Sequence, residues 1–119
     1  PHAVIFVDDV TAAPVKTAGP VLEVDQVFPQ RCNIEFVQVV DRSHLSMRVW
    51  ERGAGETLAC GTGASASVVA AVLNGLTGRT VTVKLLGGTL SIVWDEKSNH
   101  VHMTGPIAYV YDGTYLGKE

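Results

Sequence analysis

The residues best suited to chemistry lie in the segment from Trp50 to Leu76, where a glycine-rich turn leads into a run of small apolar residues. Cys60 stands directly before Gly61 and Thr62, where a helix is expected to begin. A thiol at a helix N-terminus lies at the positive end of the helix dipole, which lowers cysteine pKa values from ~8.5 to roughly 3.5–7.5. The sequence therefore predicts an ionisable Cys60, with Thr62 capping the helix.

The same turn is suited to binding a carboxylate. The first N–H groups of a helix have no intrahelical partner, so those of Gly61, Thr62 and Gly63 are available to an anion. Glu51 precedes Cys60 and can exchange a proton with its thiol, while the planar guanidinium of Arg52 can hold a carboxylate. These residues indicate proton transfer at a sulfur beside a bound acid. The plainer alternatives are a buried, inert cysteine and a solvated pair of charges.

Two other kinds of functional site are alternative interpretations of this segment. Gly61 to Ala66 matches a loose dinucleotide fingerprint, but no acid follows until Asp95, so the residue that would bind a ribose is missing. A cysteine hydrolase would pair Cys60 with a histidine base, and His2 or His44 could serve in principle. The acid upstream of the thiol favours proton exchange over a permanent thiolate.

Metal and cofactor sites fit the sequence poorly. Cys32 and Cys60 are far apart, and His100 and His102 have no obvious third ligand, so we predict surface histidines and no metal. Pyridoxal phosphate would need a lysine in a dry pocket. The lysines all lie in polar contexts, at Lys16, Lys84, Lys97 and Lys118. We therefore predict chemistry without a cofactor.

Length and composition point to one domain outside the membrane. The chain has 119 residues, a formal net charge of −3 and two cysteines. The absence of a basic stripe argues against nucleic acid as a partner, and the low cysteine count favours a reducing, cytoplasmic location. The continuous apolar run Val68 to Leu73 is far shorter than a membrane span of ~20 residues. The chain opens directly on a strand, which we interpret as a piece of a longer protein.

The elements that must position these residues are mostly strands. One helix, from Gly61 or Thr62 to Asn74–Gly75, is apolar on every side and belongs in a core. A weaker helix over Pro14 to Val24 should break or kink at Gly19–Pro20. The predicted strands are Ala3–Val7, Ile34–Val40, Leu45–Trp50, Thr80–Leu85, Thr89–Trp94, His100–Thr104 and Ile107–Tyr111. This pattern predicts an α+β fold in which a mixed, mostly antiparallel curved sheet wraps around one buried central helix.

A family signature is visible in the fifteen residues from Trp50 to Ala64, which read W-E-R-G-A-G-E-T-L-A-C-G-T-G-A. This segment resembles the second active-site signature of diaminopimelate epimerases. The likeness extends over nearly the whole chain, through Pro1–Val4, Phe28–Asn33, Gly87–Gly88 and Met103–Pro106.

The resemblance implies a cofactor-independent isomerase of lysine and peptidoglycan-precursor synthesis that interconverts LL- and meso-2,6-diaminopimelate. In this family one cysteine thiolate removes the α-proton and a second cysteine thiol delivers a proton to the opposite face. The fold implied is two similar halves, each a sheet around a central helix, with the substrate between the two helix N-termini.

The resemblance also assigns roles to residues of this chain. It implies that Cys60 is one of the two catalytic cysteines and that Glu51 and His2 assist proton transfer. The residues that it implies bind substrate are Asn33, Glu51, Arg52, Gly61 and Thr62. Among these, the backbone N–H groups of the glycine and threonine would hold the reacting carboxylate, and the asparagine and arginine would hold the distal end.

The second catalytic cysteine of the family lies in an N-terminal half that this sequence lacks, and Cys32 does not match it. We therefore expect residues 1–119 to be a single partial domain, the C-terminal portion of a two-domain epimerase that is inactive alone. Its expected partners are the N-terminal half, which would pack on Ile107 to Tyr111, and a second copy in a homodimer. The alternatives are a related proline racemase-like or phenazine-pathway-like isomerase, and a non-catalytic carboxylate-binding or dimerising module.

Overall fold

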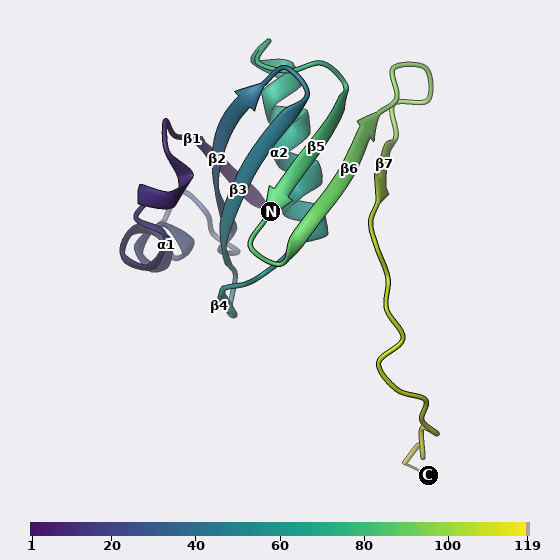
Figure 1. Cartoon of the computed structure of the whole chain (residues 1–119). Coiled ribbons are helices and arrows are strands. Elements are labelled where there is room, and N and C mark those ends of the chain that lie inside the picture. The colour runs from purple at the N-terminus through teal and green to yellow at the C-terminus, as the bar shows by residue number, and fades with distance from the viewer. Residues whose placement is uncertain (119) are drawn as a thin grey trace.

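Strands dominate the architecture, which a computed structural model describes for residues 1–118 (Figure 1). The strands are β1 (His2–Phe6), β2 (Asn33–Asp41), β3 (His44–Glu51), β4 (Gly55–Glu56), β5 (Thr80–Leu85), β6 (Gly88–Trp94) and β7 (Val101–Thr104). The helices are a short 3₁₀ turn (Val10–Ala12), α1 (Val15–Glu23) and α2 (Gly61–Leu73). Every strand predicted before Gly105 is present, with ends that agree to within one residue.

All the strands join in one seven-stranded sheet, in the order β1-β2-β3-β5-β6-β7 with β4 paired to β3. The pairs β1–β2 and β3–β5 are parallel, and the other pairs are antiparallel. The predicted α+β class and mixed, mostly antiparallel curved sheet are confirmed. The β2–β3 hairpin, which places Ile34 opposite Trp50, is the longest pairing.

Each face of the sheet contributes to a separate apolar core. One core lies between the sheet and α2 and includes Val37, Met47 and Val68. The other lies between α1 and the opposite face and includes Ile34 and Cys32. Because side chains alternate along a strand, β2 supplies odd-numbered residues to the first core and even-numbered residues to the second.

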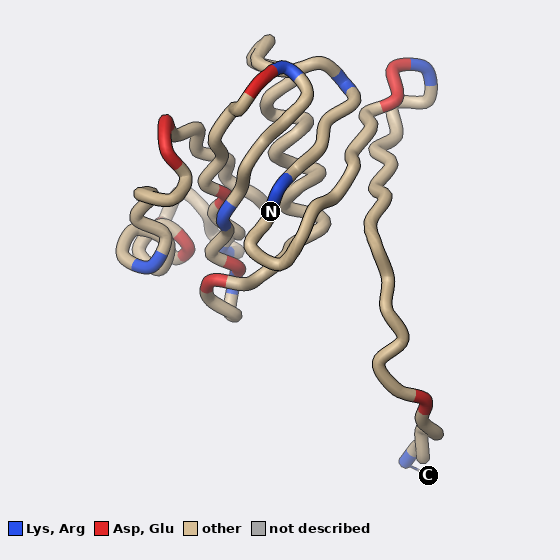
Figure 2. The backbone as a smooth tube through the Cα atoms, in the orientation of Figure 1, with Lys and Arg blue, Asp and Glu red and all other residues tan. Residues whose placement is uncertain are grey.

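The central helix α2 packs closely on the sheet because its contacting residues are small. Its buried positions are Gly63, Ala64, Ser67, Val68 and Ala71. The Ser67 hydroxyl donates to the Gly63 carbonyl oxygen at 2.7 Å, so this buried polar group is satisfied. The helix ends as predicted at Asn74–Gly75, where Gly75 adopts a φ of 69°. Figure 2 shows the charged residues mainly in turns and near strand ends, whereas α2 carries none.

The weaker helix predicted over Pro14 to Val24 is present, and Gly19–Pro20 does not break it. Helix α1 runs from Val15 to Glu23 with Pro20 inside it. Gly19 lies against Trp50, and a Cβ at this glycine would stand 2.6 Å from the Trp50 Cβ. Tertiary packing of α1 on β3 therefore outweighs the local preference against proline in a helix.

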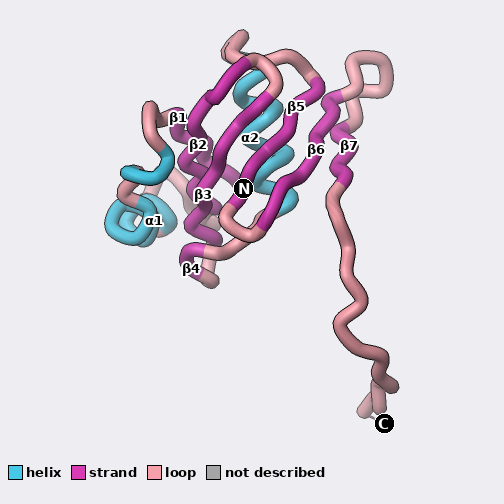
Figure 3. Tube along the Cα trace, viewed as in Figure 1, coloured by secondary structure: helices cyan, strands magenta, loops and turns pink. Residues whose placement is uncertain are grey.

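The prediction of a last strand over Ile107–Tyr111 is also wrong. After β7 the chain is irregular and runs away from the sheet (Figure 3). Ile107 is 92% exposed, and most of the apolar side chains that follow it are also exposed. An extended segment forms a strand only when a neighbouring strand pairs with it, and no such neighbour lies within residues 1–118.

In the part of the chain that the structure describes, neither α1 nor α2 combines the length and the hydropathy needed to cross a bilayer.

The core packing of α2 predicts which of its residues stabilise the fold. Val68 is fully buried, whereas Leu73 on the same helix is 73% exposed. Val68→Ala should lower the free energy of unfolding by about 2 kcal/mol, because it removes buried methyl groups and leaves a cavity. The matched Leu73→Ala change should cost about 0.5 kcal/mol or less. Urea denaturation measures both, and equal losses would contradict the packing described.

Candidate functional site

Three strand ends and one helix N-terminus meet at one end of the sheet. His2 begins β1 and pairs with Asn33, which begins β2, while β3 ends at Glu51 beside them. The turn that carries Arg52 continues from β3. Helix α2, which begins after Cys60, packs on β1, β2 and β3. The structure therefore brings the predicted residues His2, Asn33, Glu51, Arg52, Cys60, Gly61 and Thr62 to one region.

The helix cap is Cys60 and not Thr62, so the predicted cap is wrong. Cys60 has an extended backbone, and its Sγ accepts a hydrogen bond from the Gly63 N–H at 3.3 Å. The Thr62 hydroxyl lies 3.7 Å from the same sulfur. The thiol thus occupies the place that an oxygen of serine or aspartate usually takes.

The prediction of a readily ionised thiol is wrong as well. Cys60 is only 7% exposed, and burial raises the pKa of its thiol above the usual value. The N–H of Gly63 and the Thr62 hydroxyl act in the opposite direction, because they stabilise the thiolate, but they do not offset burial. The nearby Glu51 carboxylate adds to the rise. Cys60 is therefore a neutral thiol at pH 7 and is suited to giving up a proton.

Two of the three backbone donors predicted to bind an anion are free. Among residues 1–118 no hydrogen bond uses the N–H of Gly61 or of Thr62, the first groups of α2. The prediction is wrong for Gly63, because its N–H already donates to the Cys60 Sγ. Met103 of β7 lies against Gly61, where a Cβ would meet its Sδ at 2.7 Å. An anion bound here can therefore take the place of the partners that the Gly61 and Thr62 N–H groups lack.

The Glu51 side chain is held within the site. Its Oε2 accepts a hydrogen bond from the Thr57 hydroxyl, across the turn that leads to α2. Its charge acts on both Cys60 and His2, so the three groups share one electrostatic environment.

Asn33 and Arg52 are tied to each other through the main chain. The Asn33 Oδ1 accepts the backbone N–H of Arg52 at 2.7 Å, and the Arg52 Nη1 donates to the Gln30 carbonyl at 3.1 Å. Glu23 of α1 steadies the same turn, because its carboxylate accepts from the Trp50 indole at 2.8 Å and from the Gly53 N–H at 2.9 Å. The guanidinium remains exposed at the open side of the site.

One residue of the site was missed from the sequence, namely Glu35. Its side chain is 0% exposed, and its Oε1 lies 2.6 Å from the His2 Nδ1. Burial raises the pKa of Glu35 to about 8. Burial also lowers the pKa of His2. The sequence does contain a sign of this residue, since it is the one acid within the apolar run of β2 and its position faces the same side of the sheet as the buried Val37.

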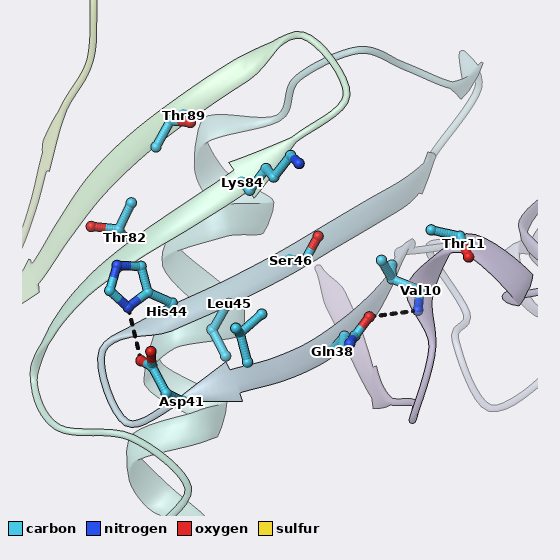
Figure 4. A pocket seen from close by; sticks show the side chains of 11 residues that line it. Val10, Thr11, Gln38, Asp41, His44, Leu45, Ser46, Thr82, Lys84 and Thr89 are labelled. Carbon is cyan, nitrogen blue, oxygen red and sulfur yellow. Dashed lines mark hydrogen bonds and ion pairs between the residues drawn. The ribbon is translucent and has the colours of Figure 1, made fainter.

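His44 and a hollow on the sheet lie away from this site. His44 begins β3, whereas Glu51 ends it, so a base at His44 cannot serve Cys60. Its Nδ1 pairs with Asp41 at 2.8 Å. A hollow of about 560 Å³ lies beside this pair on the sheet face away from α2 (Figure 4). It is lined by strand residues such as Lys84 and by none of the predicted site residues.

Among residues 1–118, no group of three or more His, Cys, Asp or Glu side chains is placed to hold a metal ion.

Comparison with protein families and curated proteins gives strong matches. A family model described as diaminopimelate epimerase matches residues 1–110. The diaminopimelate epimerase of Acetivibrio thermocellus is 59% identical over 95% of this chain and 40% of its own length. That of Moorella thermoacetica is 57% identical over 97% and 41%, respectively. The chain thus spans about two fifths of the curated relatives that it matches.

Solved structures share the fold at low sequence identity. A phenazine biosynthesis protein of the PhzF family from Enterococcus faecalis superimposes with a TM-score of 0.61 at 15% identity, over 82% of this chain and 35% of that one. A PhzF-family protein from Bacillus anthracis gives 0.57 at 18% identity, over 84% and 33%. These likenesses show that the fold of this chain is shared with part of those larger proteins.

The burial of Cys60 predicts how its thiol reacts. Alkylation by iodoacetamide should be slow near neutral pH and rise about tenfold per pH unit on the alkaline side, because the raised pKa keeps the thiolate scarce until then. Mass spectrometry of the modified peptide gives the rate. Cys32, which is 0% exposed, should stay unmodified and serves as the internal control. Fast labelling of Cys60 that is independent of pH would overturn this picture.

Proposed function

The chain belongs to the diaminopimelate epimerase family, and we propose that it forms the part of such an epimerase that carries one of two proton-transfer cysteines, Cys60. The observation that carries the proposal is the neutral thiol beside two unused backbone N–H donors. A substrate carboxylate bound to those donors would bring its α-carbon next to the sulfur. The reaction would interconvert LL- and meso-2,6-diaminopimelate, in the synthesis of lysine and peptidoglycan precursors.

The proposed reaction moves one proton off and one proton onto the α-carbon. A thiolate on one face takes the α-proton, and the electron pair of the C–H bond stays on the α-carbon and is delocalised into the carboxylate. A thiol on the opposite face then delivers its own proton, which forms the new C–H bond with inverted configuration. Because Cys60 rests as a thiol, it acts as the donor first and as the acceptor in the reverse direction. The other cysteine comes from the N-terminal half of the enzyme.

The free donors at the start of α2 supply the electrostatic part of catalysis. Negative charge grows on the substrate carboxylate as the α-proton leaves, and the N–H groups of Gly61 and Thr62 are already oriented towards it. They need no reorganisation, and the buried surroundings strengthen their effect. This arrangement lowers the barrier without a metal or an organic cofactor.

His2 and Glu51 assist the proton transfer at Cys60 in this proposal. The charge of Glu51 acts on both Cys60 and His2, and the side chains of Glu51 and His2 are partly exposed. Asn33 and Arg52 hold the distal end of the substrate, where the planar guanidinium fits a second carboxylate. The main-chain link between these two residues keeps their spacing fixed.

The same proposal accounts for the apolar tail. Ile107, Tyr109 and Tyr111 are among the exposed side chains after β7, and a contiguous apolar surface of this kind marks a contact with another polypeptide. We propose that the N-terminal half packs here, that the chain alone is inactive and that the complete enzyme is a cytoplasmic homodimer.

A proline racemase-like or phenazine-pathway-like isomerase would share the fold and differ in its preferred substrate. A non-catalytic module would bind carboxylates without proton exchange.

Exchange of the substrate α-hydrogen tests the role of Cys60. In the complete protein, diaminopimelate should take up deuterium from heavy water, as followed by NMR. Cys60→Ala should lower epimerisation by about 10²–10⁴-fold or more, because it removes a proton-transfer group. Cys32→Ala is the control and should retain activity, since that thiol lies in the other core. Undiminished epimerisation by Cys60→Ala would refute its role, and a panel of amino acids would identify a different substrate.

The distal contact predicts an effect on substrate binding rather than on chemistry. Arg52→Ala should raise KM for diaminopimelate by about 10–100-fold, because it removes a charged hydrogen bond of about 1.5–3 kcal/mol, while kcat changes less than about threefold. Steady-state kinetics of the complete protein give both constants.

Arg42→Ala is the matched control, since Arg42 lies at the opposite end of the sheet and contacts the Gly75 carbonyl oxygen. A fall in kcat with an unchanged KM for Arg52→Ala would place this arginine at the reacting carbon instead.

A further inference from the structure

Glu35 is the most deeply buried acid among the residues that the structure describes. It lies in the middle of an apolar run of β2, faces α2 and is 0% exposed. Its Oε2 has no hydrogen-bond partner within residues 1–118. A buried carboxyl group with an unused oxygen is costly, so its presence calls for a role that an apolar side chain cannot fill.

The contact that Glu35 does make is with His2. Its Oε1 lies 2.6 Å from Nδ1, which is a short and well-formed hydrogen bond between neighbouring strands. The other ring nitrogen, Nε2, takes part in no hydrogen bond in the described part of the chain. The His2 side chain is 22% exposed, whereas that of Glu35 is fully enclosed. The histidine therefore links the enclosed acid to the open site.

Gly63 places this pair next to the reactive sulfur. A Cβ at Gly63 would lie 2.8 Å from the Glu35 Oε1 and 3.1 Å from the Cys60 Sγ. The carboxyl oxygen and the sulfur therefore face the same small space beside the first turn of α2. Only glycine leaves room there for both groups.

We propose that Glu35 is a positioning residue for proton transfer at this site: it holds the His2 imidazole through Nδ1, so that Nε2 is the nitrogen left to face the site. The inference rests on the epimerase function proposed above. The carboxyl group acts through His2 and does not touch the substrate.

The hydrogen bond fixes the protonation pattern of the ring as well as its orientation. When Glu35 is protonated, its O–H donates to Nδ1 and the ring carries its own proton on Nε2. When Nε2 releases that proton to the site, the carboxyl proton moves to Nδ1 and Glu35 becomes the carboxylate. The proton balance is then closed within the pair, and the departing proton always leaves from Nε2.

Several charged or titratable groups act on this pair. The charge of Glu51 on β3 acts on both members, and the Cys60 thiol faces the Glu35 carboxyl group from the start of α2. Burial raises the pKa of Glu35 to about 8, so the acid is mostly protonated at neutral pH and ionises above it. Replacing the acid should therefore change the pH dependence of the rate on its alkaline side.

A double-mutant cycle in the complete protein tests the inference. Glu35→Leu should lower kcat by about 10–100-fold and change KM less than about threefold, because the ring loses its support while the substrate contacts remain. Glu35→Gln keeps the volume and one hydrogen bond, and it should recover much of kcat but lose the alkaline limb. In a His2→Gln background, Glu35→Leu should have little further effect, since its action passes through the histidine.

A second measurement does not depend on activity. ¹⁵N NMR of the His2 ring, identified by its loss in His2→Gln, should show Nδ1 engaged in a strong hydrogen bond in the unaltered protein. Glu35→Leu should leave a mixture of the two ring tautomers. If Glu35→Leu does not fold, Glu35→Gln alone and in the His2→Gln background supplies both measurements.

Val37→Ala is the matched control, because Val37 lies on the same face of β2, is equally buried and has no contact with the histidine. It should lower stability and leave kcat and its pH dependence unchanged. The inference fails if Glu35→Gln and Glu35→Leu keep the kcat and pH profile of an enzyme that Cys60→Ala inactivates, or if the Glu35 and His2 effects simply add. If the unaltered complete protein does not exchange the substrate α-hydrogen, the proposed function is refuted instead. The ¹⁵N spectra of the His2 ring would still test the His2–Glu35 contact.

Discussion

The close approach of the first turn of α2 to the sheet is the constraint on which the rest of the site depends. Gly63 lets the helix settle so near β2 that the Cys60 sulfur and the Glu35 carboxyl oxygen share the space where a side chain would stand. The small residues that follow along the helix maintain the same distance. The thiol is consequently buried at the helix N-terminus, where dipole and desolvation act on it in opposite directions.

Desolvation decides the charge state of the site. Burial raises the pKa of Cys60 and of Glu35 and lowers that of His2, so each group is driven towards its neutral form. In their neutral forms Cys60 and Glu35 each carry a proton, and a neutral thiol is less reactive than a thiolate. The negative charge of a bound carboxylate would meet the unused N–H groups of Gly61 and Thr62 rather than a fixed thiolate, which would repel it.

The sequence predicted the parts of the fold that local pattern controls. Alternation gave the β2–β3 hairpin, and caps and small residues gave α2 with its end at Asn74–Gly75. The misses arise from tertiary contacts that pattern does not contain. Pro20 stays helical because α1 packs on Trp50, and Ile107–Tyr111 has no strand beside it. The low pKa expected for Cys60 followed from the helix dipole alone, whereas burial has the larger effect. The role of the acid between Ile34 and Phe36 could not be predicted from local pattern, because its partner His2 is distant in sequence.

The groups of the candidate site all come from the sheet and from α2, namely the His2 imidazole, the Cys60 thiol and the free N–H groups of Gly61 and Thr62. Inversion at a carbon requires proton-transfer groups on both faces of the reacting atom, so in the proposed epimerisation the single thiol of this region accounts for one face. In the same proposal, the exposed apolar side chains after β7 are where the polypeptide that supplies the other face would pack, because exposed apolar surface often marks a contact with another polypeptide. One proposed division of the fold thus explains both the need for a second thiol and the exposed apolar side chains.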